Sequence, residues 1–178
     1  MVQQGIGPIM LVKDLPPSGP FLNSSMNLSK NFTLTEYTKS QTALRQGIDN
    51  TPNEEHLASA KLLFENVVQP VRDHFGPTVI NSGYRGPELN AAIGGAATSQ
   101  HCRGEAVDIE VPGVPNHTLA EWIENNLEYD QLILEFYTLG IPDSGWVHVS
   151  YIPEGCRKQS LTAVKENGKT VYLSGLIA

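Results

Sequence analysis

Helical and strand-forming segments are segregated along this sequence. Apolar residues recur at helical spacing in residues 57–75, whereas the later segments 106–111, 131–137 and 146–151 are short apolar runs rich in β-branched or aromatic residues. Helices that precede strands without regular alternation are typical of α+β proteins. We therefore expect an α+β fold, in which helices pack on a small, mostly antiparallel sheet.

Capping and turn residues set the limits of several elements. Thr33 and Glu36 form a capping box that predicts a helix through about residue 45, and the long helix is expected to kink near Pro70. Asn167 and Gly168 separate two alternating segments, which predicts a hairpin with a type I′ turn. Further elements are expected as a strand at 78–80 and helices at 87–93 and 119–127.

The chain is most simply one domain preceded by an arm. Residues 1–30 are rich in Pro, Gly, Ser and Asn without sustained periodicity, so we expect an extended or partly disordered arm before a domain at 31–178. The net charge of −7, from 12 basic and 19 acidic side chains without a long basic block, argues against a nucleic-acid partner. No apolar run is long enough to insert into a membrane.

The N-terminal segment lacks the basic leader of a secretory signal peptide. Its short apolar patch is followed by Lys13 and Asp14, so we expect synthesis in the cytoplasm. Because that compartment is reducing, Cys102 and Cys156 are expected to be free thiols.

An aspartate stands inside one of the expected strands. Asp108 lies in an apolar run, where burial of its charge is costly unless a cation compensates for it. His101 and His148 lie in a neighbouring loop and a later strand, from which all three side chains can converge on one metal ion. Catalytic zinc takes three such ligands and keeps a fourth position for water. The alternative is that Asp108 caps a turn or pairs with Arg85 or Arg103, while both histidines are ordinary half-buried side chains.

Several short motifs follow one another in a set order: Ser82-Gly83-Tyr84-Arg85, Leu89-Asn90, Ser99-x-His101-x-x-Gly104-x-Ala106-x-Asp108 and Trp146-x-His148. Together they resemble the zinc D-Ala-D-Ala carboxypeptidase and L-Ala-D-Glu endopeptidase family, whose members cleave the stem peptides of peptidoglycan. The resemblance spans roughly residues 34–151 and is strongest to small carboxypeptidase-like members common in bacteriophages. It implies the α+β fold that the DD-peptidases share with the hedgehog signalling domain.

The resemblance also assigns roles to single residues. It implies that Zn²⁺ is bound by His101, Asp108 and His148. It implies that substrate is contacted by Tyr84, Arg85, Ser99 and Trp146. Arg85 takes the place of the family arginine that steadies the substrate carbonyl or carboxylate, a task that suits a planar, permanently charged guanidinium. Ser99 can equally hold its own loop, and Gly104 is expected to serve a backbone conformation with positive φ.

This sequence differs from that of some relatives at the position of the catalytic base. A zinc hydrolase needs a base that takes a proton from the attacking water and delivers it to the leaving amine. In several relatives, such as the vancomycin-resistance dipeptidases, a glutamate stands three residues before the last histidine, where this chain has Gly145. Glu135, at the end of an apolar strand, is the best replacement and is expected to be catalytic together with Arg85. Asp143 and His117 are weaker candidates.

These residues predict a zinc metallopeptidase that cleaves bonds involving D-amino acids in cell-wall stem peptides. Both a D-Ala-D-Ala carboxypeptidase and an L-Ala-D-Glu endopeptidase fit the motifs. The alternative is a non-catalytic zinc-binding module for recognition or virion structure, which the glycine at position 145 favours. An enzyme made in the cytoplasm would reach the wall after lysis or as part of a virion, which fits a phage endolysin.

Overall fold

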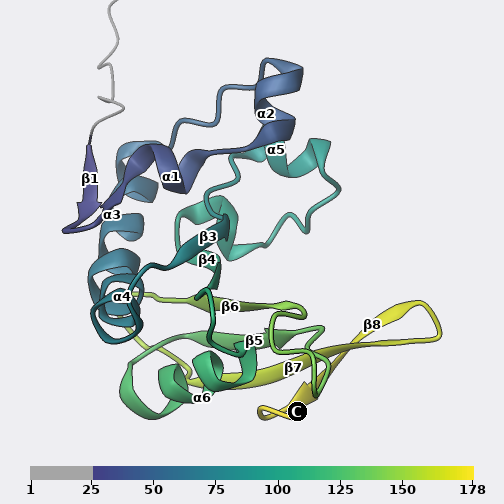
Figure 1. Ribbon diagram of the computed structural model, residues 1–178. Coiled ribbons are helices and arrows are strands. Elements are labelled where there is room, and N and C mark those ends of the chain that lie inside the picture. The colour runs from purple at the N-terminus through teal and green to yellow at the C-terminus, as the bar shows by residue number, and fades with distance from the viewer. Residues whose placement is uncertain (1–25) are drawn as a thin grey trace, which may run out of the picture.

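A six-stranded mixed sheet runs through the protein, whose computed structural model describes residues 26–178 (Figure 1). In spatial order its strands are β3 (Val79–Ser82), β4 (Ala106–Glu110), β6 (Trp146–Ser150), β5 (Gln131–Glu135), β7 (Gln159–Glu166) and β8 (Lys169–Ser174). Neighbouring strands are antiparallel except β5 and β7, which are parallel. The predicted α+β class with a mostly antiparallel sheet is confirmed. The parallel pair arises because the chain reverses after β6 and returns along the other edge of β5.

The remaining elements lie mostly before the sheet in the sequence. They are β1 (Asn27–Ser29), β2 (Phe32–Thr33), α1 (Leu34–Thr38), α2 (Gln41–Gln46), α3 (Glu54–Leu63), the π-helical turn η2 (Phe64–Val68), α4 (Gln69–Phe75), α5 (Pro87–Ala92), the 3₁₀ turn η3 (Gln100–Arg103) and α6 (Asn116–Asn126). The predicted arm lies largely outside the described residues, and β1 pairs with β2 at its end. None of the described helices is both long and apolar enough to cross a membrane.

The first helix is shorter than the capping box suggested. Thr33 and Glu36 form the predicted box, in which each side chain accepts a hydrogen bond from the other residue's backbone N–H. The helix stops at Thr38, however, because Ser40 is extended and caps a new helix by accepting from Ala43 N. The predicted helix at 33–45 is therefore two short helices.

The long helix continues from α3 through η2 into α4. Within η2, the N–H of Gln69 donates to the carbonyl of Phe64, five residues earlier. Pro70 follows directly, and its ring would crowd a carbonyl in a regular helix. The wider turn relieves this crowding, so the kink predicted near Pro70 takes the form of a π-helical turn.

Side chains that alternate along the strands divide the sheet into a core face and an open face. Val107 and Ile109 of β4, with Leu132 and Leu134 of β5, are fully buried in the core with apolar residues of the long helix and α6. Strand side chains point alternately to opposite faces. Asp108 therefore faces away from the core, although it lies between two core residues.

The C-terminal hairpin of β7 and β8 extends the sheet at one edge (Figure 1). Asn167 and Gly168 have φ values of 50° and 76°, and the flanking residues pair directly, as the predicted type I′ turn requires. Cys102 and Cys156 are free, as predicted.

Candidate metal centre

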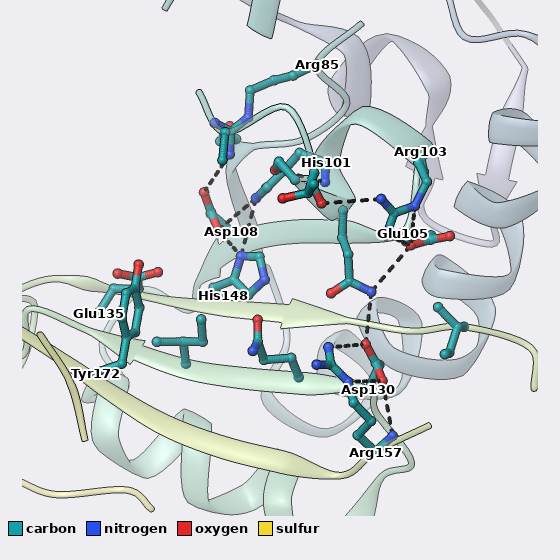
Figure 2. A pocket seen from close by; sticks show the side chains of 18 of the residues that line it. Arg85, His101, Arg103, Glu105, Asp108, Asp130, Glu135, His148, Arg157 and Tyr172 are labelled. Atoms are coloured by element: carbon teal, nitrogen blue, oxygen red, sulfur yellow. Dashed lines mark hydrogen bonds and ion pairs between the residues drawn. The ribbon is translucent and has the colours of Figure 1, made fainter. Parts of the chain in front are cut away.

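Two histidines and an aspartate meet on the open face of the sheet (Figure 2). His101 comes from η3, whereas Asp108 of β4 and His148 of β6 are direct cross-strand partners. His148 Nδ1 lies 3.0 Å from Asp108 Oδ1, and His101 Nε2 lies 3.3 Å from that oxygen and 3.3 Å from His148 Nδ1. Within residues 26–178, no other group of three or more His, Cys, Asp or Glu side chains is arranged to share a metal ion.

Local structure aims His101 at this point. The hydroxyl of Ser99 accepts a hydrogen bond from the N–H of His101 and begins η3, and Gly104 ends it with a φ of 73°. A Cβ at position 104 would lie 2.2 Å from the carbonyl oxygen of His56. Gly104 thus has the predicted positive φ, and it also allows the long helix to approach the loop closely.

The electrostatics favour a cation at the meeting point. His101 Nδ1 lies 2.8 Å from the carbonyl oxygen of Gly83, so this nitrogen carries the proton and the lone pair of Nε2 faces the cluster. Burial lowers the pKa of His101, which keeps the ring neutral. Burial opposes ionisation of Asp108, but the influence of the adjacent His101 and His148 outweighs it and holds the pKa of Asp108 below its ordinary value.

The donor set fits zinc. Ligand atoms around a tetrahedral zinc ion, with bonds of about 2.0–2.1 Å, lie about 3.3 Å from one another. The two imidazole nitrogens and the carboxylate oxygen are 3.0–3.3 Å apart. Each of these atoms offers a lone pair to the same point when His101 and His148 are neutral and Asp108 is ionised. His101, Asp108 and His148 are therefore positioned to hold one zinc ion.

A cavity of about 980 Å³ opens over this cluster and is lined by Arg85, Glu135 and Trp146 as well as the three metal-ligand candidates (Figure 2). One Nη of Arg85 lies 3.9 Å from Asp108 Oδ2. Its Nε is buried and has no hydrogen-bond partner among the described residues. The rest of the guanidinium lines the cavity beside the metal site, where its N–H donors are suited to an oxygen atom of a substrate.

Glu135 lies on the same face of the sheet as the cluster. Its strand neighbour Ile133 pairs with His148, and Glu135 follows two positions later, so Glu135 and His148 are diagonal neighbours. Such neighbours have Cα atoms about 7–8 Å apart, which leaves space for a water molecule or a substrate atom between their side chains. Burial raises the pKa of Glu135 above its ordinary value, while His148 acts in the opposite direction.

Other residues singled out in the sequence lie in different places. Ser99 lines the cavity as well as capping η3. Tyr84 is buried away from the cavity, with its hydroxyl 3.0 Å from His56 Nδ1. His117 stacks on Tyr137 and pairs with Glu121, outside the cavity. Asp143 likewise lies outside it, beside the loop after β4.

Position 145, where several relatives carry a glutamate, has no room for a side chain. Gly145 has a φ of 65°, and a Cβ there would lie 1.9 Å from the carbonyl oxygen of Glu135. The chain bends tightly at this point, since Phe136 opposite also has a positive φ of 53°. The glycine is therefore a requirement of this turn, and Glu135 on the adjoining strand supplies the carboxylate of this region.

We expect Gly145→Ala to destabilise the protein by about 2–4 kcal/mol, because it adds a backbone clash to an unfavourable φ. Gly140→Ala is the matched control, because Gly140 also has a positive φ but has no atom within 4 Å of an added Cβ. It should cost about 1–2 kcal/mol. Urea unfolding of both variants measures the difference. Equal losses would show that the contact with Glu135 is unimportant.

A buried polar network beside the cavity could not be predicted from the sequence. Asp130 accepts hydrogen bonds from the backbone N–H and the guanidinium of Arg157 and from the side chain of Gln100 (Figure 2). Gln100 is the first residue of η3 and also contacts Glu105. The network therefore joins the start of β5 and the loop before β7 to the turn that carries His101. Its members are far apart in sequence, and none belongs to a recognisable motif.

Removing the carboxylate of this network should weaken the fold. Hydrogen bonds, chiefly from Arg157, lower the pKa of Asp130 to about 2 from 3.8. Because the pKa of Asp130 is lower in the folded than in the unfolded protein, ionised Asp130 stabilises the fold above about pH 4. This stabilisation is lost as the pH falls from about 4 to about 2. We expect Asp130→Asn to lower the free energy of unfolding by at most about 2 kcal/mol at pH 7, and by much less at pH 2.5.

Urea unfolding at the two pH values tests this expectation. Glu128→Gln is the control, because the ion pair that Glu128 forms with Lys158 is exposed. Exposed pairs contribute little, so this variant should resemble the wild type. A loss in Asp130→Asn that is the same at both pH values would contradict an electrostatic origin.

The comparisons with known proteins agree with this geometry. The sequence model of a family described as Peptidase M15 matches residues 30–150. None of the curated proteins matches the chain significantly. The matched segment covers more than half of the sequence and includes Arg85, Glu135 and the three metal-ligand candidates, which confirms the resemblance inferred from the motifs. The chain belongs to the M15 peptidase family.

Proposed function

We propose that the protein is a zinc-dependent peptidase that hydrolyses amide bonds in the stem peptides of peptidoglycan. Membership of the M15 family supports a metallopeptidase and a peptide substrate. The observation that carries the proposal is the cluster of His101, Asp108 and His148, which opens into a cavity that is also lined by a half-buried carboxylate, Glu135, and a guanidinium, Arg85. These are the groups that metal-assisted hydrolysis requires.

Each group has a distinct part in the reaction. His101, Asp108 and His148 would hold a zinc ion, which would supply Lewis-acid chemistry for the attacking water and the scissile carbonyl. Glu135 takes a proton from the attacking water as the water oxygen bonds to the carbonyl carbon. It then passes this proton to the nitrogen, so that the C–N bond breaks and a neutral amine and a carboxylic acid are released. Arg85 holds a carbonyl or carboxylate oxygen of the substrate through the part of its guanidinium that lines the cavity.

The first test is hydrolysis of a defined stem peptide. The zinc-loaded protein is incubated with N-acetyl-L-Ala-γ-D-Glu-L-Lys-D-Ala-D-Ala, and the products are identified by mass spectrometry. This peptide contains both the L-Ala-D-Glu and the D-Ala-D-Ala bond. We expect cleavage of one of them, and loss of cleavage when zinc is removed with a chelator. A zinc-loaded protein that leaves both bonds intact would reject the peptidase assignment for this substrate class.

That negative result would favour the alternative, a zinc-binding recognition or virion module. The sequence argument for such a module was the glycine at position 145. Its weight is reduced because Gly145 is imposed by a tight turn, and because Glu135 places a carboxylate in the cavity. Cytoplasmic synthesis and an endolysin role in a bacteriophage stay predictions from the sequence.

A further inference from the structure

The C-terminal hairpin adds an aromatic residue to the cavity. Tyr172 of β8 lines it, although β7 and β8 lie outside the segment matched by the family. Cross-strand pairing places four residues in one row on the open face, in the order Trp146, Glu135, Ala163 and Tyr172. Glu135 thus lies between two aromatic residues of the same row, with only a methyl group between it and Tyr172.

Tyr172 and Glu135 flank this methyl group in the row. Ala163 is fully buried even though its side chain is the smallest of the row. Burial raises the pKa of Tyr172, and the charge of Glu135 adds to the effect, as expected when the two side chains approach each other. Figure 2 shows both at the same end of the pocket. Tyr172 as a residue is nevertheless 55% exposed, which leaves part of it accessible to a ligand.

The proposed function fixes which part of a substrate lies at this end. Glu135 delivers its proton to the nitrogen of the leaving amine, so the leaving portion must lie on the Glu135 side of the zinc site. Trp146 and Tyr172 therefore line the path of the leaving peptide. Asp130 and Arg157, which also line the cavity, lie away from Glu135 and Tyr172 (Figure 2), and that end is left for the acyl portion.

Tyr172 lies on a strand farther from the zinc site than the strand of Glu135. β8 is three strands away from β6, which carries His148, and neighbouring strands are about 4.8 Å apart, so the two backbones are about 14 Å apart across the sheet. One extended residue spans about 3.5 Å. A single released amino acid would remain close to His148, whereas a longer leaving peptide would reach the exposed part of Tyr172.

We propose that Tyr172 is a specificity-determining residue that contacts the second or a later residue of the leaving peptide. The proposal rests on the peptidase function above and extends it. It means that the cavity favours substrates that continue well beyond the scissile bond, as in endo-cleavage, over removal of one terminal residue.

Two peptides with the same scissile bond test this proposal. N-acetyl-L-Ala-γ-D-Glu releases one residue on cleavage of its L-Ala-D-Glu bond, whereas the pentapeptide N-acetyl-L-Ala-γ-D-Glu-L-Lys-D-Ala-D-Ala releases four. We expect Tyr172→Ala to lower kcat/KM for cleavage of this bond in the pentapeptide about tenfold, with no change for the short peptide. Tyr172→Phe should retain most of the activity, because the ring provides the contact. An equal effect of Tyr172→Ala on both peptides, or no effect, would overturn the proposal.

A binding measurement separates this proposal from the peptidase function itself. Calorimetry compares zinc-loaded Glu135→Gln with Glu135→Gln/Tyr172→Ala, and the pentapeptide should bind about tenfold more weakly to the double variant. Equal binding would overturn the role of Tyr172 even if hydrolysis occurs. Weaker binding without any hydrolysis by the wild type would support the contact and reject the peptidase assignment. Lys169→Ala, an exposed change on β8 outside the cavity, is the control. Added to Glu135→Gln, it should leave the affinity for the pentapeptide unchanged.

Discussion

Replacement of His148 by alanine should remove bound zinc and peptidase activity together. His148 supplies one of the three donor atoms that lie 3.0–3.3 Å apart, and the cavity offers no neighbouring imidazole that could replace it. Loss of a supporting partner of a metal ligand already weakens metal binding about 10–100-fold, so loss of a ligand itself should cost at least about 100-fold. Activity should fall at least as far, since the reaction depends on the ion.

Metal analysis after dialysis, together with hydrolysis of the stem pentapeptide, measures both effects. His117→Ala is the matched control, because that histidine stacks on Tyr137 outside the cavity. It should retain zinc and activity at the wild-type level. Zinc bound stoichiometrically and with unchanged affinity by His148→Ala would show that the ion is held elsewhere, and the assignment of the cluster would have to be abandoned.

The convergence of His101, Asp108 and His148 could be predicted because the relevant signals are local. Asp108 interrupts an apolar run, and strand alternation alone turns it away from the core between Val107 and Ile109. A single pairing, Asp108 opposite His148, then brings two ligands together. A short turn positions His101, and the glycine that ends this turn, Gly104, could be recognised in the sequence.

Other parts of the site depend on contacts that no local pattern encodes. Tyr84 adjoins Arg85 in the same motif, yet the two side chains point to different places, and Tyr84 packs beside Tyr37 and His56 in the interior. The position of Tyr172 next to Glu135 depends on the order of four strands, including the parallel pair of β5 and β7. Sheet order depends on how distant segments share the core, so short-range periodicity cannot determine it.

Replacement of Glu135 by glutamine should lower kcat by about 100- to 10,000-fold while zinc stays bound. Glutamine has nearly the same shape as glutamate but cannot accept the proton from water, and general base catalysis contributes rate factors of this size. The carboxylate is a diagonal neighbour of His148 and is not one of the three clustered donors, so metal content should not change. Steady-state hydrolysis of the pentapeptide and metal analysis measure the two quantities. Glu166→Gln, an exposed change on the same sheet outside the cavity, should have no effect.

The pH dependence distinguishes a base from a residue that only shapes the cavity. Burial raises the pKa of Glu135, and the residue must be ionised to accept a proton. The rate of the wild-type enzyme should therefore fall as the pH drops through this raised pKa, at a higher pH than for an exposed glutamate. In Glu135→Gln, the residual rate should lose that acidic limb. If the variant kept the same limb with only a uniformly lower rate, another group would be the base, and Glu135 would be limited to holding the substrate.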